Sequence, residues 1–162
     1  MKIQIIPAKL YHAKAIHALV RDAAQEELML PRPLGTIYEL IRDFMVARDE
    51  NGTIIGCCAL HIAWETLAEI RSLAVAEEYR RHGIGKQLVE ACLENACELG
   101  IPRIFALTYV PPFFIQCGFH EISKDELPHK IWSDCINCHK FPDCDEKAVA
   151  ITLTETQGES NA

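Results

Sequence analysis

The segment Glu69-Ile-Arg-Ser-Leu-Ala-Val75 leads into Arg80-Arg-His-Gly-Ile-Gly85 and then into a long periodic run that ends at Leu99. The first segment is typical of a strand, and the second is a turn that contains two glycines. Apolar residues then recur at helical spacing, at Ile84, Leu88, Ala91/Cys92, Ala96 and Leu99. A strand that enters a glycine turn and opens an amphipathic helix predicts an α/β domain.

The glycine turn has the properties of an anion site. Gly83 and Gly85 have no Cβ, so their backbone can approach a ligand closely. The free N–H groups and the dipole at the start of a helix favour a phosphate there. Arg80, Arg81 and Lys86 add positive charge to the turn. Together these features predict a cradle for a pyrophosphate.

Two familiar phosphate motifs do not fit this turn. A P-loop requires Gly-Lys-Ser/Thr, whereas Gly85-Lys86 is followed by Gln87. A dinucleotide fingerprint requires three glycines, and this turn has two. The alternative that remains open is an ordinary helix start with solvated arginines.

The rest of the chain predicts one mixed α/β domain over residues 1–154, followed by a flexible tail over 155–162. A helix is expected to begin at Thr36, because Thr36 and Glu39 fit a capping box. Asn51-Gly52 predicts a hairpin turn. We expect strands over 2–6, 44–48, 53–64, 69–75, 103–108 and 147–153, and helices over 12–27, 36–43, 85–99 and 111–116.

Composition narrows the class of protein. The chain has 162 residues, 49% of them hydrophobic, which fits a single globular domain. Its net charge of −7 argues against a general nucleic-acid binder but permits a local basic pocket. Ile54–Trp64, the longest apolar stretch, is too short to span a bilayer, and no apolar core of signal-peptide length follows the N-terminus. We therefore expect a cytoplasmic protein with no membrane partner and with mostly reduced cysteines.

Two motifs resemble those of one enzyme superfamily. Arg80-x-x-Gly83-x-Gly85 resembles the acetyl-CoA-binding motif of the GNAT N-acetyltransferases, and Phe113-Phe-Ile-Gln-Cys-Gly-Phe119 resembles a later segment of that superfamily. The resemblance implies a mixed sheet, flanked by helices, that is splayed open between strands 69–75 and 103–108. It also implies an acetyl-CoA cosubstrate and a possible homodimer. The implied cofactor contacts are the backbone of Leu73, Ala74 and Val75 for the pantetheine arm, and Arg80, Arg81, His82, Gly83, Ile84, Gly85 and Lys86 for the pyrophosphate.

The resemblance also supplies candidates for the acceptor side. Acetyl transfer requires a neutral amine, and many members of the superfamily use a glutamate at the position of Glu69 as general base. Strand alternation puts Glu69, Arg71 and Leu73 on one face. The Arg71 guanidinium would make Glu69 a weaker base, so either a water chain compensates or the two residues are a structural ion pair. Alternatively, Arg71 holds a substrate carboxylate, with Arg32 as a second candidate.

The group that protonates the leaving thiolate is a departure from the superfamily pattern. The usual tyrosine is replaced by Phe114, which has no hydroxyl. Tyr109, at the end of the preceding strand, is the substitute candidate, although the residue alone favours an ordinary half-buried tyrosine. Protonation by water or direct thiolate release are the remaining routes.

A cysteine-bearing insertion spans about 127–146. Cys135 and Cys138 have the spacing of a zinc knuckle, and Cys144 follows. His129, His139 or Asp143 would complete a tetrahedral zinc site. Reduced structural thiols or a disulfide are the alternatives.

These cysteines, the Leu127-Pro-His-Lys-Ile-Trp132 segment and Glu69-Ile-Arg-Ser-Leu-Ala-Val75 resemble short, stand-alone N-acetylglutamate synthases. That family acetylates the α-amino group of L-glutamate in arginine biosynthesis, and the resemblance implies that Arg71 contacts a substrate carboxylate. Direct attack in a ternary complex is expected. The alternatives are another small amine or a protein N-terminus as acceptor, or a non-catalytic acetyl-CoA-binding module.

Overall fold

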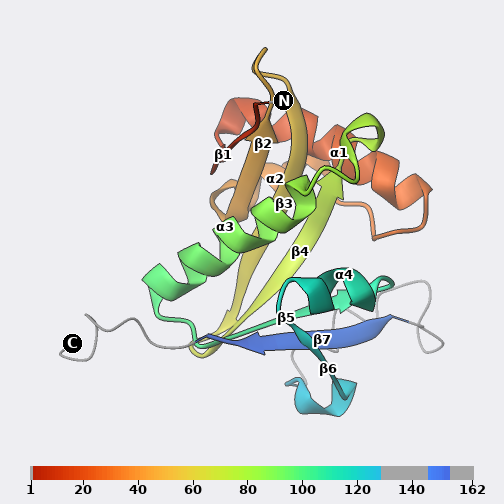
Figure 1. The fold of residues 1–162 in the computed structure, drawn as a ribbon. Coiled ribbons are helices and arrows are strands. Elements are labelled where there is room, and N and C mark those ends of the chain that lie inside the picture. The colour runs from red at the N-terminus through yellow and green to blue at the C-terminus, as the bar shows by residue number, and fades with distance from the viewer. Residues whose placement is uncertain (1, 129–145, 154–162) are drawn as a thin grey trace.

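The computed structural model describes residues 2–128 and 146–153, which form one mixed sheet with helices on both faces (Figure 1). In this part of the chain the strand order is β1-β2-β3-β4-β5-β7-β6. The β4–β5 pair is parallel and the other neighbouring pairs are antiparallel. The strands are β1 Gln4–Pro7, β2 Phe44–Arg48, β3 Ile54–Trp64, β4 Leu67–Val75, β5 Arg103–Thr108, β6 His120–Ile122 and β7 Lys147–Thr152.

The parallel pair in the middle of the sheet separates along its length. β4 and β5 pair from Leu67 with Arg103 to Glu69 with Phe105. Beyond Glu69, β4 continues alongside β3 while β5 continues alongside β7. The predicted splayed sheet is confirmed, and the opening begins at Glu69.

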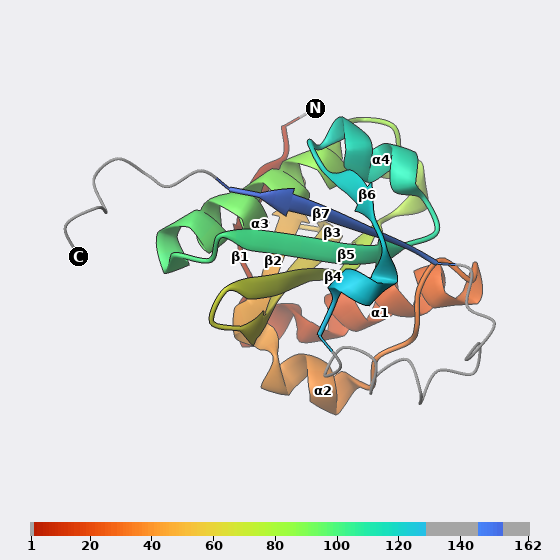
Figure 2. The ribbon, with the colours of Figure 1, turned by 90° about the horizontal axis from the view of Figure 1, so that it is seen from below.

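The helices cover the two faces of the sheet separately (Figures 1 and 2). One core cluster joins α3 to the strands, and its most buried members include Leu88, Cys92 and Ile104. A second cluster joins α1 and α2 to the other face, around Ile16, Ile37 and Val46. The helices are α1 Ala13–Gln25, α2 Leu34–Glu39, α3 Ile84–Leu99 and α4 Pro111–Gln116.

The second helix begins earlier than predicted. α2 starts at Leu34 with Pro33 as its N-cap, so Thr36 lies inside the helix and the predicted capping box is wrong. The fixed φ of proline prepares the chain for a helix at the next residue. A 3-10 turn, Ile41–Asp43, follows and brings Asp43 to the start of β2.

Two further details differ from the sequence prediction. Leu99 is 57% exposed rather than buried, because Gly100 adopts a left-handed conformation and Ile101 folds back into the core. The short strand β6 was not predicted, since three residues are too few for a periodic signal. Among residues 2–128 and 146–153, no helix has the length and apolarity needed to cross a membrane. The tail 155–162 and most of the cysteine-bearing insertion lie outside the described residues.

Candidate active site

A bulge in β4 divides the strand into two functional ends. Cys57 pairs with Ala74 and Ala59 pairs with Arg71, so β4 contains one more residue than β3 at this point. Ser72 absorbs the irregularity with φ of 53°, an uncommon value for a residue with a side chain. The bulge reverses the alternation, so that Leu73 packs into the α3-side core. The prediction that Leu73 shares a face with Glu69 and Arg71 is therefore wrong.

The thiol of Cys57 lies beneath this bulge. Its Sγ donates to the carbonyl of Ser72 at 3.3 Å and also accepts from the backbone N–H of Ala74. Burial raises the pKa of the Cys57 thiol to about 12, so the group stays protonated and remains a donor at neutral pH. A buried side chain thus satisfies backbone groups that the bulge removes from the ladder.

An ion pair stands at the start of the opening between β4 and β5. The Nε of Arg71 donates to Glu69 Oε1 at 2.7 Å, and both side chains are largely buried. The short distance makes this a charge-assisted hydrogen bond. The expected proximity of Glu69 and Arg71 is confirmed.

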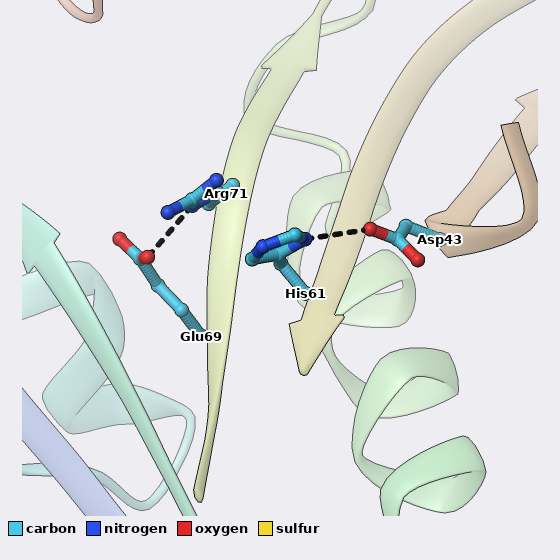
Figure 3. A network of polar contacts seen from close by, with 4 residues as sticks. All are labelled: Asp43, His61, Glu69 and Arg71. Atoms are coloured by element: carbon cyan, nitrogen blue, oxygen red, sulfur yellow. Dashed lines mark hydrogen bonds and ion pairs between the residues drawn. The ribbon is translucent and has the colours of Figure 1, made fainter. Parts of the chain in front are cut away.

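A second polar pair, which the sequence analysis missed, lies across the strand. The Nδ1 of His61 lies 2.9 Å from Asp43 Oδ2, and the imidazole must be the donor because a carboxylate only accepts. His61 is the direct ladder partner of Glu69 (Figure 3). The available signal was the β3–β4 hairpin, whose register places the two polar residues opposite one another. Asp43 had no such signal, because it comes from a turn distant in the sequence.

Arg71, His61 and Asp43, but not Glu69, line a depression beside the opening. Its volume is about 300 Å³, including space open to solvent. Both predicted substrate arginines, Arg32 and Arg71, line it. The complete lining is Arg32, Thr36, Ile37, Leu40, Asp43, Phe44, Ala59, His61, Arg71 and Ser72. The pocket lining therefore combines cationic and anionic side chains with apolar ones, as ligand sites commonly do.

The other end of β4 leads into the glycine turn. Arg81 and Gly83 have φ of 68° and 77°, and α3 begins directly after Gly83 without a side-chain cap. A left-handed residue followed by helical residues points successive N–H groups toward one spot, which suits an anion. A Cβ at Gly85 would lie 3.3 Å from the ring of Phe113. The backbone is therefore approached closely from outside the helix at this position.

The cations of the turn differ in how they are held. Arg80 donates from Nε to the Val75 carbonyl at 3.1 Å and from a terminal nitrogen to Glu26 at 2.8 Å. The hydrogen bond with Arg80 lowers the pKa of Glu26. Arg81 and His82 are exposed, as is Lys86, while the predicted contact Ile84 is buried in the core. Arg80 thus ties the turn to β4 and to the end of α1.

Two positions were considered for protonating the leaving thiolate, Phe114 and Tyr109, and they lie in different environments. Phe114 is buried and makes edge-to-face contacts with Phe113 and Phe119, so this position serves the core. Tyr109 directly follows β5, on the far side of the opening from β4. Its predicted role remains a prediction.

The metal prediction falls on residues that the structure does not describe. Cys135, Cys138 and Cys144 lie within 129–145, outside the described residues. Within the described ranges, no group of three or more His, Cys, Asp or Glu side chains is arranged to hold a metal ion.

The geometry agrees with comparisons to known proteins. The model of the acetyltransferase (GNAT) family matches residues 14–121, which include the bulged strand, the glycine turn and the pocket. The chain belongs to the GNAT acetyltransferase family. It is therefore an acetyl-CoA-dependent N-acetyltransferase, as the sequence predicted.

The relatives of this GNAT enzyme include proteins named as amino-acid acetyltransferases. An uncharacterized N-acetyltransferase of Chlorobaculum tepidum is 47% identical over 90% of this chain and 94% of its own. A Mycobacterium tuberculosis protein named amino-acid acetyltransferase is 37% identical over 74% of this chain and 70% of its own.

The solved structures give the same fold. A structure of N-acetylglutamate synthase from Neisseria gonorrhoeae, complexed with coenzyme A and N-acetyl-glutamate, matches with a TM-score of 0.86 and 26% identity. The match covers 96% of this chain but 36% of that one. A Mycobacterium tuberculosis protein in complex with CoA matches with a TM-score of 0.80 and 29% identity, covering 93% of this chain and 99% of that one.

Proposed function

We propose that this enzyme transfers the acetyl group of acetyl-CoA to the α-amino group of L-glutamate. The observation that carries the proposal is the pair of arginines, Arg32 and Arg71, in one pocket beside the opening of the sheet. The amino-acid acetyltransferase relatives and the N-acetylglutamate synthase fold support it. N-acetylglutamate formation makes arginine biosynthesis, in the cytoplasm, the proposed setting.

The charges of the pocket favour an amino acid with a second carboxylate. Glutamate has two carboxylates, and the planar guanidinium groups of Arg32 and Arg71 suit bidentate carboxylate binding. The chain as a whole has a net charge of −7, so an anionic substrate requires such a local concentration of cations. A polyamine would require a pocket of carboxylates without these arginines.

The proposed chemistry is direct attack in a ternary complex. Glu69 accepts a proton from the ammonium group, directly or through water, and the free amine then attacks the thioester carbonyl. The leading end of α3 holds the pyrophosphate, and the backbone of Leu73–Val75 guides the pantetheine arm toward the bulge. Tyr109 is the proposed donor to the leaving thiolate.

A thiol-release assay with a panel of acceptors tests the proposal. Glutamate is expected to give turnover, while aspartate, lysine and spermidine give little. Arg71→Ala is expected to raise the KM for glutamate by about 100-fold, the scale of a lost charge-assisted pair. Arg42→Ala, an arginine outside the pocket lining, is the matched control. Preference for spermidine or lysine would contradict the proposal.

A further inference from the structure

The pair of His61 and Asp43 has no task in the chemistry described so far. His61 lies directly opposite Glu69 in the antiparallel β3–β4 ladder. Side chains at such positions share a face, with Cβ atoms about 5 Å apart. An imidazole and a carboxylate in this arrangement are close enough for one water to bridge them.

The two sides of the ladder differ in their access to solvent. The side chain of Glu69 is 10% exposed and is bound by Arg71. The side chain of His61 is 30% exposed and lines the pocket. Asp43 holds one edge of the imidazole, and the opposite edge points toward β4, the strand of Glu69 and Arg71 (Figure 3).

Because Glu69 is largely buried, the proton that it accepts in each turnover must still reach solvent. Its carboxylate must lose the proton it has taken before it can accept another. A largely buried group exchanges protons with solvent slowly unless a second titratable group connects it to water. Histidine is the side chain best suited to this step near neutral pH.

We propose that His61, positioned by Asp43, carries the ammonium proton from Glu69 to solvent; this proposal rests on the proposed role of Glu69. The ammonium N–H bond breaks and its proton goes to the Glu69 carboxylate. The proton then moves through a bridging water to Nε2 of His61, and the resulting imidazolium releases it to solvent. The second amine proton leaves as the amide forms, and the departing thiolate takes up one proton, so that each turnover releases one proton in total.

The surrounding charges suit this path. Asp43 on the 3-10 turn stabilises the transient imidazolium, since its carboxylate accepts from Nδ1. Arg71 from β4 and Arg32 from the loop before α2 also line the pocket. Charged groups of both signs therefore surround the imidazole.

The kinetic test compares His61→Gln with wild type over a range of pH. We expect kcat to fall about 10- to 100-fold, while the KM for acetyl-CoA stays within about twofold. The dependence of kcat on pH should also differ between the variant and wild type. Added imidazole should restore part of the activity of His61→Ala. His120→Gln, which alters an exposed histidine on β6, is the control.

Two kinetic outcomes would contradict the proposed proton relay from Glu69 through His61 to solvent. One is an unchanged kcat in His61→Gln at every pH. The other is a loss confined to the KM for the amino acid, which would make His61 a substrate ligand. Asp43→Asn should reduce kcat about 3- to 10-fold, because the imidazole remains but its orientation is less fixed.

A measurement without turnover tests the same geometry. Imidazole ¹⁵N NMR of the wild-type protein should show neutral His61 with its proton on Nδ1, and Asp43→Asn should weaken that preference. A proton on Nε2 in the wild type would contradict the relay, because Nε2 must be free to accept.

The proton relay through His61 and the proposal that glutamate is the acceptor are contradicted by different results. If wild-type enzyme prefers another amine, the glutamate proposal is wrong and His61→Gln is assayed with that amine. A loss of kcat there still supports the relay. If glutamate is the acceptor and His61→Gln is as fast as wild type, the relay alone is wrong.

Discussion

The two ends of β4 perform their tasks with different parts of the chain. Before the bulge at Ser72, the strand presents the side chains of Glu69 and Arg71, paired at 2.7 Å. After the bulge, it leads to a turn where Gly83 and Gly85 present backbone N–H groups at the start of α3. In the proposed function, the first end recognises the acceptor and handles protons, and the second end binds the pyrophosphate of the cosubstrate.

Whether a site is built from backbone groups or from side chains determines how far apart its residues lie in the sequence. A backbone site is local, because a single turn of about six residues provides all the donors. The side-chain site requires Arg32, Asp43 and His61 from three separate elements, together with β4. Changes at the acceptor end should therefore alter kcat or acceptor binding, while changes at the cofactor end should alter acetyl-CoA binding.

The largest expected effect is that of Glu69→Gln at the acceptor end. The amide cannot accept the ammonium proton, so kcat should fall about 100- to 1,000-fold. The KM for acetyl-CoA should stay within about twofold, measured by initial rates of thiol release. Glu65→Gln, in the exposed turn after β3, is the control. A rise in the acetyl-CoA KM without loss of kcat would break the separation of the two ends.

Stability at alkaline pH tests the bulge that divides the two ends. The buried thiol of Cys57 has a raised pKa of about 12, whereas in the unfolded chain it ionises near 8.5. Above pH 8.5 the folded state therefore keeps a thiol proton that the unfolded chain loses. The thiol's contribution to stability is complete below that pH and declines as pH rises toward 12.

The expected slope is about 1.4 kcal/mol of unfolding free energy per pH unit for one such thiol. A hydrogen bond with Cys92, together with burial, also raises the pKa of the neighbouring Cys58, which acts in the same direction. Urea unfolding at several values between pH 8 and 11 should show a steep decline that Cys57→Ala makes shallower, while Cys97→Ala leaves it unchanged. Identical slopes in wild type and Cys57→Ala would contradict the buried, neutral thiol.

A smaller effect is expected from Gly85→Val at the cofactor end. The added methyl groups would meet the Phe113 ring, which already lies 3.3 Å from an ideal Cβ, and would cover the N–H groups of the first turn. The KM for acetyl-CoA should rise about 10- to 30-fold, on the scale of one lost charge-assisted hydrogen bond. Calorimetry with coenzyme A measures the same change directly. Gly35→Ala, at a position with open space around it, should bind coenzyme A normally.

The smallest effect is expected from Glu26→Gln. Glu26 holds the Arg80 guanidinium from the end of α1 at 2.8 Å, at an exposed site where such pairs contribute little. The KM for acetyl-CoA should change about two- to fourfold, with kcat unaltered, since Arg80 keeps its bond to the Val75 carbonyl. Glu27→Gln alters the adjacent carboxylate as a matched control. A fall in kcat would connect α1 to the chemistry and weaken the contrast between the two ends.

Most of the fold was predictable because each long element has its own period. The Asn51-Gly52 turn and the α3 stripe are local signals, and both strands of that hairpin and the helix lie where the sequence placed them. The prediction errors occur at positions where contacts between distant parts of the chain determine the backbone conformation. The bulge at Ser72 placed Leu73 on the opposite face, and the fold-back of Ile101 left Leu99 exposed. Neither a bulge nor a fold-back alters the pattern of apolar residues that the prediction used.

The sequence by itself determined the cofactor end and half of the acceptor end. The glycine turn and the i, i+2 spacing of Glu69 and Arg71 require only residues close together in the chain, so they can be read without a fold. Only the tertiary structure placed Asp43, from a turn distant in the sequence, against His61. The physical reason is that strand pairing and the position of a helix end are fixed by burial of the whole core. Polar pairs that depend on them become visible only once that core is formed.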